Sequence, residues 1–182
     1  GKGAEHNILI KDAESLEQAH KINAVILDKT GTITEGKPEV SDIIFAYGVQ
    51  VNYLKSVLLA IESQSEHPLA EAVVRFLQKE KTLAVNVNRI ESVTGKGVTA
   101  LYQGKNYLIG NIALLRENGI KVSPILQASI RQLQEQAKTV VAFAEDNDVV
   151  AIIAISDKIK ATSKAAIQQL QDRGIEVYML TG

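Results

Sequence analysis

Cysteine is absent from this 182-residue sequence, which excludes disulfide bonds and thiolate metal sites. The three histidines, His6, His20 and His67, are scattered along the chain and form no recognisable zinc-binding pattern. No block of like charge occurs, and the formal net charge is -1. Because a nucleic-acid backbone requires a basic surface, this charge balance argues against nucleic acid as the main partner.

Long apolar runs are also missing. None approaches the roughly 18 residues of a membrane-spanning helix, and the longest, residues 149–155, has the length of a strand. We recognise no signal peptide. The sequence begins at Gly1 and its only methionine is Met179, so we expect a piece of a longer protein. The composition, 46% apolar and 23% charged, is that of a globular chain with one sizeable core or two small ones.

The most informative stretch is residues 28–34, with the sequence DKTGTIT. It follows the apolar run 24–27, which predicts a buried strand. A carboxylate at the end of that strand would lie at the carboxyl edge of a parallel sheet, where such sheets carry their chemistry. Gly31 permits a sharp turn, and the neighbouring hydroxyl and N–H groups suit phosphate oxygens. Asp28 is therefore a candidate nucleophile that would form an aspartyl-phosphate.

The two ends of the chain have parallel α/β character. The strand candidate 149–155, a helix over residues 160–173 and a strand over residues 175–180 form a βαβ unit at this spacing. Because both ends share this character, Ile26 and Val177 should lie in one sheet. Residues 7–11 are a further strand candidate, and Asp12 should cap a helix over residues 13–21.

The middle of the chain has α+β character instead. Residues 36–38 (GKP) should break the chain where one domain passes into another. Asn52 should cap one helix and Pro68 should begin a second, and two more should cover residues 111–118 and 123–136. The expected strands are residues 40–47, 85–93, 98–102, 106–110, 139–144 and 149–155.

Residues 28–32 (DKTGT) resemble, residue for residue, the phosphorylation motif of P-type ATPases. Thr34 fits the longer pattern, and Ile33 stands where the family usually has Leu. The resemblance implies an α/β phosphorylation domain of the haloacid-dehalogenase type, residues 1–36 and 152–182, which is partial. It implies an inserted α+β nucleotide-binding domain, residues 37–151, built on an antiparallel sheet flanked by helices.

Residues 65–70 (SEHPLA) resemble the nucleotide-domain signature of the heavy-metal P-type ATPases. The resemblance implies that His67 orients the nucleotide and that Glu62 accepts a hydrogen bond from the adenine amino group. Taken alone, Glu62 would be a solvated helix carboxylate. Residues 95–97 (GKG) match a Gly-X-Gly of the family, whose Gly95 and Gly97 would let backbone approach the nucleotide.

Asn111 completes this implied pocket, because Gly110-Asn111 matches a Gly-Asn pair of the family. Without the resemblance, Asn111 is a helix cap. Lys96 is the variable middle residue of its motif, although its charge would suit a triphosphate.

The phosphoryl site is only partly represented. Residues 157–160 (DKIK) match an Asp-Pro-X-Lys/Arg segment, with Lys158 in place of proline, and Thr181-Gly182 match the start of Thr-Gly-Asp. The resemblance implies one set of catalytic residues: Asp28, Lys29, Thr30, Thr32, Lys160 and Thr181. It implies Mg²⁺ at Asp28 and Thr30. The family's later Mg²⁺ carboxylates are not in this sequence, so we expect the isolated chain to bind ATP but to show little autophosphorylation.

The first functional hypothesis is therefore an ATP-binding and phosphorylation-site fragment of a heavy-metal pump, on the cytoplasmic side of an integral membrane protein. Its partners would be ATP, the transmembrane and actuator domains of the pump, and a metal ion bound elsewhere. Glu66 and the Gly110-Asn111 pair favour copper(I) export. One alternative is a haloacid-dehalogenase-type phosphatase, which Thr30 disfavours because it occupies the position of the usual general acid. The other is a nucleotide-binding module without catalysis.

Overall fold

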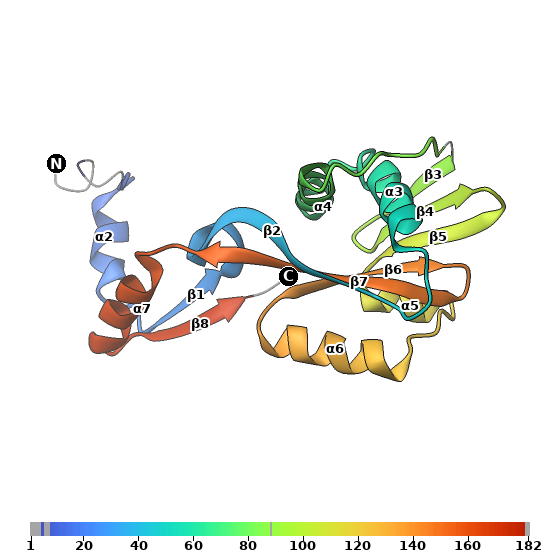
Figure 1. Cartoon of the computed structure of the whole chain (residues 1–182). Helices are drawn as coiled ribbons and strands as arrows, with labels where there is room; N and C mark the ends of the chain where they lie inside the picture. Colours follow the sequence, from blue (N-terminus) through green and yellow to red (C-terminus); the bar gives the residue numbers. More distant parts are fainter. Residues whose placement is uncertain (1–4, 6–7, 88, 181–182) are drawn as a thin grey trace. The chain divides into compact units, whose positions relative to one another are not determined.

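The computed structural model describes residues 5, 8–87 and 89–180 (Figure 1). The backbone contacts divide the chain into two compact units. The terminal unit comprises Gly1–Gly36 and Lys158–Gly182, and the inserted unit comprises Lys37–Asp157. Thr181 and Gly182 lie outside the described residues, so the structure gives no position for the predicted catalytic Thr181.

A pair of parallel strands forms the centre of the terminal unit. β1 (Ala24–Asp28) pairs with β8 (Glu176–Leu180), with Val25 opposite Val177 and Asp28 opposite Leu180. The expected sharing of one sheet by the first and last strands is thus confirmed. The unit also contains the helices α2 (Ala13–Ala19) and α7 (Ser163–Asp172). As expected, Asp12 caps α2 by accepting a hydrogen bond from the Ser15 N–H.

Three expectations for the terminal unit are wrong. Residues 8–11 form neither strand nor helix. β1 is not buried, since the Ile26 side chain is 69% exposed and the sheet has only two strands among the described residues. Each helix is shorter than expected: α2 ends at Ala19, and α7 begins at Ser163.

The inserted unit is built on a six-stranded sheet in the order β2-β7-β6-β5-β4-β3, in which the four neighbouring pairs from β3 to β7 are antiparallel. Its strands are β2 (Thr34–Phe45), β3 (Arg89–Val93), β4 (Gly97–Tyr102), β5 (Lys105–Gly110), β6 (Thr139–Glu145) and β7 (Asp148–Ile159). Its helices are α3 (Val51–Glu62), α4 (Pro68–Lys79), α5 (Ile112–Glu117) and α6 (Pro124–Glu135).

Both faces of this sheet are covered by helices (Figure 1). One core packs α3 and α4 against β7 residues such as Ile153, and the other packs α5 and α6 against residues such as Ile152. Consecutive β7 side chains enter opposite cores because side chains alternate across a strand. This alternation explains why residues 149–155 are an uninterrupted apolar run.

The segment 36–38 marks the passage from one unit to the other, as expected, but it does not interrupt the strand. β2 continues through it, and the boundary between the two units falls inside the strand, between Gly36 and Lys37. Pro38 is compatible with this arrangement because β2 is at the edge of the sheet, where strands tolerate proline. The second boundary falls between Asp157 and Lys158, within β7. The sequence placed it between residues 151 and 152.

Two element starts in the inserted unit differ from expectation. α3 begins at Val51 after Gln50, so Asn52 lies inside the helix and does not cap it. The strand expected from residue 85 begins only at Arg89. By contrast, α4 and α6 begin at Pro68 and Pro124 as predicted, because a first-turn proline loses no intrahelical bond.

Candidate functional site

Asp28 is the last residue of β1, and its side chain is exposed. The loop that follows, Lys29–Ile33, turns at Gly31, where φ is +78°. The buried side chain of Thr34, which is only 3% exposed, stabilises this turn. Its Oγ1 accepts a hydrogen bond from the Gly31 N–H at 3.1 Å and donates one to the Lys29 carbonyl at 3.0 Å. The loop therefore has a defined shape next to the carboxylate.

Residues of the segment after β7 also stabilise this loop, by hydrogen bonds to its carbonyl groups. Lys160 Nζ donates to the Gly31 carbonyl at 2.6 Å, and the Lys160 N–H donates to the Ile33 carbonyl at 3.0 Å. Ser163 Oγ donates to the Ile33 carbonyl at 2.7 Å and is buried. The structure thus places Lys160 at the Asp28 loop, as predicted. The role of Ser163 was not predicted, because a single serine after the Lys160 segment does not by itself indicate a contact with the Asp28 loop.

The other predicted catalytic side chains, Lys29, Thr30 and Thr32, lie on this loop. Asp28 and the Thr30 carbonyl are oxygen donors, the kind that Mg²⁺ prefers, and they would supply a minority of its roughly six ligands. Within the described residues, no three His, Asp or Glu side chains gather in a way that could hold a metal ion. Asp157 lies in the inserted unit, where its carboxylate accepts a hydrogen bond from the Lys37 N–H at 3.0 Å.

Glu62 ends α3 and is only 5% exposed. Burial raises the pKa of its carboxyl group from the ordinary 4.5 to about 7. Its side chain makes no hydrogen bond or ion pair with any described residue. Its carboxyl oxygens keep some contact with solvent, because no fully buried side-chain oxygen among the described residues lacks a partner. The interpretation of Glu62 as a solvated helix carboxylate is therefore wrong. A largely buried carboxyl that has no protein partner and still reaches the surface is a position where a ligand donor would be favourable.

His67 precedes α4 and caps it. Its Nδ1 accepts a hydrogen bond from the Leu69 N–H at 3.2 Å, and Pro68 follows it as the first helical residue. In the neutral ring the proton is then on Nε2, which has no partner among the described residues. The exposed ring is thus held in one orientation with a free donor.

The turn between β3 and β4 carries Gly95 and Gly97, which differ in their surroundings. A Cβ on Gly97 would lie 2.1 Å from the Ile109 carbonyl oxygen, so β4 could not pair with β5. Gly110 is equally confined, since its Cβ would lie 2.4 Å from the Lys96 carbonyl oxygen. A Cβ on Gly95 would meet nothing within 4 Å. Close packing within the protein therefore explains Gly97, and only Gly95 borders open space.

Asn111 joins this turn to α5. Its N–H donates to the Lys96 carbonyl at 2.9 Å, and its Nδ2 donates to the Gly95 carbonyl at 3.5 Å. Its Oδ1 accepts from the Leu114 N–H at 2.9 Å, which caps α5. The capping role suggested by the sequence is thus confirmed, and the same side chain also contacts the glycine turn.

The structure therefore forms two groups from the predicted nucleotide residues. Gly95, Gly97 and Asn111 are in mutual contact through backbone and amide hydrogen bonds. Glu62 and His67 lie at the two ends of the short loop between α3 and α4. No hydrogen bond or ion pair joins the two groups within the part of the chain that the structure describes.

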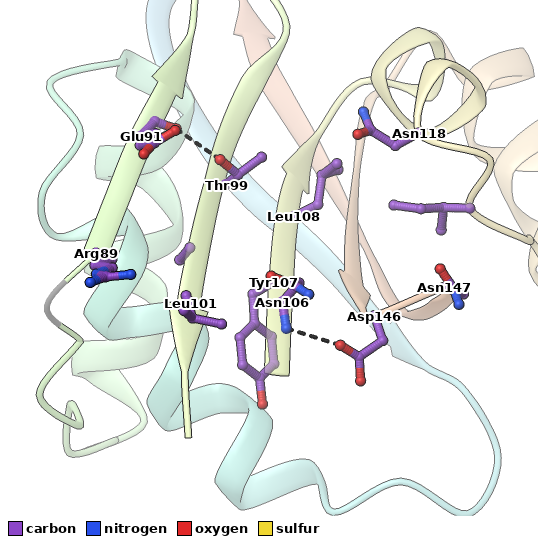
Figure 2. A pocket seen from close by; sticks show the side chains of 12 residues that line it. Arg89, Glu91, Thr99, Leu101, Asn106, Tyr107, Leu108, Asn118, Asp146 and Asn147 are labelled. Atoms are coloured by element: carbon purple, nitrogen blue, oxygen red, sulfur yellow. Dashed lines mark hydrogen bonds between the residues drawn. The ribbon is translucent and has the colours of Figure 1, made fainter. Parts of the chain in front are cut away.

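A hollow of about 420 Å³ lies elsewhere on the inserted unit, over β3, β4 and β5 (Figure 2). Arg89, Glu91 and Asn147 are among its polar lining residues, and Leu101 and Leu108 are among its apolar ones. None of the predicted nucleotide residues lines it. This hollow was not predicted, because its residues come from three strands and from two turns that are distant in the sequence.

The model of the haloacid dehalogenase-like hydrolase family matches residues 22–182. The chain therefore belongs to this family of hydrolases, and the predicted fold class is confirmed. Within the part of the chain that the structure describes, no helix is both long and apolar enough to cross a membrane.

More particular similarity is to metal-transporting ATPases. The chain is 42% identical over 182 residues to a probable copper-exporting P-type ATPase of Archaeoglobus fulgidus, covering 100% of this chain and 22% of that protein. It is 41% identical over 183 residues to a copper-exporting P-type ATPase of Legionella pneumophila, covering 100% of this chain and 24% of that protein. The chain spans less than a quarter of the length of these curated relatives.

The chain is also similar to solved structures of metal-transporting ATPases. A zinc-transporting PIB-type ATPase in its E2.Pi state superposes with a TM-score of 0.62 at 32% identity, covering 95% of this chain and 28% of that one. The catalytic CPx-ATPase domain CopB-B superposes with a TM-score of 0.68 over 99% of this chain and 60% of that one. Its 21% identity supports the fold alone.

Proposed function

We propose that this chain is the ATP-binding and phosphorylation-site portion of an ATP-driven pump for heavy-metal ions. The observation that carries the proposal is Asp28, which ends a parallel strand and is followed by a loop held by Thr34 and Lys160. This arrangement supports covalent catalysis, because an exposed carboxylate follows a strand end and lies beside fixed backbone groups. The Archaeoglobus and Legionella copper pumps resemble the whole chain.

The terminal unit would carry the phosphoryl transfer. Asp28 Oδ attacks the γ-phosphorus of ATP, the bond between that phosphorus and the bridging oxygen breaks, and ADP leaves. Lys160 keeps the Gly31 carbonyl in place and brings a positive charge to the loop. When bound, Mg²⁺ would neutralise phosphate charge, with Asp28 and the Thr30 carbonyl among its ligands. Water then hydrolyses the aspartyl-phosphate.

The inserted unit would bind the nucleotide. Glu62 would accept a hydrogen bond from the adenine amino group, which supplies the partner that this buried carboxyl lacks within the protein. His67 would orient the base with its fixed ring. The open space beside Gly95, together with Asn111, supports the passage of the nucleotide along the glycine turn.

Copper(I) is the proposed cargo, and the cytoplasm is the proposed location of both units. The support is the similarity to copper-exporting pumps over the full length of this chain. Other proposed partners are the transmembrane and actuator domains of the pump. The metal ion would bind outside this chain.

The test is phosphoenzyme formation in membranes that contain the intact pump. Labelled ATP and Mg²⁺, followed by acid quenching, should give a hydroxylamine-sensitive label that copper(I) stimulates more than zinc. Asp28→Asn should abolish the label, whereas Asp12→Asn, a carboxylate of the same unit that only caps α2, should retain it. A label that survives in Asp28→Asn would overturn the assignment of the nucleophile.

A further inference from the structure

One ion pair of the inserted unit lies directly on the glycine turn. Lys96, between Gly95 and Gly97, donates from Nζ to both carboxylate oxygens of Glu117, at 2.8 and 2.7 Å. Glu117 is the last residue of α5, the helix that Asn111 caps. The lysine side chain therefore connects the turn to the far end of α5.

The ion pair is not needed to hold the turn. The Lys96 carbonyl already accepts from the Asn111 N–H, and Gly97 already pairs with Gly110 in the sheet. Both charged side chains are about half exposed, at 41% and 53%. Exposed ion pairs contribute little to stability, because solvent and salt screen them, so little free energy is lost when one separates. A stronger acceptor close to the turn could therefore take the lysine from Glu117.

We infer that Lys96 binds the phosphate chain of the nucleotide and that Glu117 competes with the phosphates for it. This inference rests on the proposed nucleotide site. In the empty site, Lys96 is paired with Glu117. When ATP binds, its phosphates offer more negative charge than one carboxylate, and Lys96 turns to them. Glu117 then remains as an unpaired negative charge that opposes the polyphosphate.

Glu117 therefore lowers affinity for ATP without touching the base. Glu117→Gln should bind ATP about two- to fivefold more tightly, the range expected for the loss of one exposed ion pair. Its affinity for adenosine, which has no phosphate, should be unchanged. Lys96→Met should bind ATP more weakly by a similar factor and adenosine equally well. Lys96→Arg should keep most of the affinity for ATP.

A double-mutant cycle separates this competition from a structural role. In the Lys96→Met background, Glu117→Gln should produce a smaller gain in ATP affinity, because the carboxylate then no longer competes for a cation and only its repulsion of the phosphates is removed. Lys105→Met is the matched control, since Lys105 also pairs with one carboxylate, Glu145, at 2.7 Å and is 47% exposed. It should change neither affinity.

Calorimetric titrations of the 182-residue chain with ATP and with adenosine, at about 50 and 200 mM salt, test the inference. Each substitution should alter the ratio of ATP affinity to adenosine affinity less at the higher salt, because salt screens the interactions of exposed charges. An equal loss of both ligands in Glu117→Gln would show a structural role and overturn the inference. An unchanged ratio in every variant would also overturn it. If the unmodified chain bound neither ligand, the proposed nucleotide site itself would fail.

Discussion

Gly97 lies directly opposite Gly110 in the β4–β5 pair, and neither backbone leaves room for a Cβ. The glycine turn of the proposed nucleotide site is thus fixed to β5 by mutual close approach. Gly97 is required by close packing within the protein, whereas Gly95 borders open space. Substituting each in turn should therefore distinguish a packing role from a role in ligand contact.

Gly97→Ala should destabilise the inserted unit by about 3 kcal/mol or more, because its Cβ would meet the Ile109 carbonyl at 2.1 Å. Gly95→Ala should cost only about 1 kcal/mol, the price of a left-handed residue, since its φ is +69° and the space around it is open. Urea unfolding followed by circular dichroism would measure both. Equal costs would contradict the geometry.

The second prediction concerns Glu62 and pH. Below about pH 4.5 its carboxyl is protonated in the folded and unfolded chain alike. Between pH 4.5 and about 7 the unfolded chain releases this proton and the folded chain retains it, so its contribution to stability falls as pH rises. The shift corresponds to about 3 kcal/mol, at 1.36 kcal/mol for each pKa unit.

Glu62→Gln should therefore match the unmodified chain at pH 4.5 and exceed its unfolding free energy by up to about 3 kcal/mol at pH 8. Denaturant unfolding at the two pH values gives the comparison. Glu66→Gln is the matched control, because Glu66 is exposed and lies on the same loop. If Glu62→Gln and Glu66→Gln gave the same pH profile, burial of Glu62 would have no energetic consequence.

The third prediction locates the nucleotide. His67→Ala should weaken ATP binding by about tenfold, the loss expected for one good hydrogen bond or stacking contact. Asp28→Asn should retain ATP binding, because the residues proposed to hold the base and the glycine turn all belong to the inserted unit. Arg89→Ala is the control for the other hollow of the inserted unit (Figure 2) and should have no effect. Backbone NMR shifts during an ATP titration would report all three.

A loss of ATP binding in Arg89→Ala, with His67→Ala unaffected, would move the nucleotide to that hollow. The same spectra provide an internal check, since shifts should gather around Glu62, His67 and the Gly95 turn.

Local chemistry made much of this molecule predictable from sequence. Pro68 and Pro124 marked helix starts, and the apolar runs marked β1, β7 and β8, because these signals act within a few residues. The exposure of Ile26 and the continuity of β2 through Pro38 were not predictable. They depend on how many strands a sheet has and which strand forms its edge.

The site shows the same division. The motif around Asp28 was recognisable because its residues are contiguous in the sequence. The hydrogen bond of Ser163 to the Ile33 carbonyl was not predictable, because it joins residues far apart in the chain. Burial of Glu62 was likewise invisible, because a carboxylate at the end of a helix is usually solvated. The role of Glu117 was not predictable from sequence, because its partner Lys96 lies 21 residues earlier and outside α5.

The last prediction connects the buried carboxyl to the ligand. With a pKa of about 7, Glu62 is partly protonated in the empty site at neutral pH. A hydrogen bond from the adenine amino group favours the charged form and lowers its pKa. Binding should therefore release a proton, up to about half of one per site at pH 7, and less at pH 8, where the carboxyl has already ionised.

Adenosine is the ligand for this measurement, because it has no phosphate that titrates near neutral pH. Calorimetry in two buffers with different ionisation enthalpies would give the number of protons released. Glu62→Gln should bind adenosine more weakly and release none, whereas Glu66→Gln should release as many as the unmodified chain. Proton uptake in place of release would mean that the neutral carboxyl donates to the base, and the direction of the proposed hydrogen bond would be reversed.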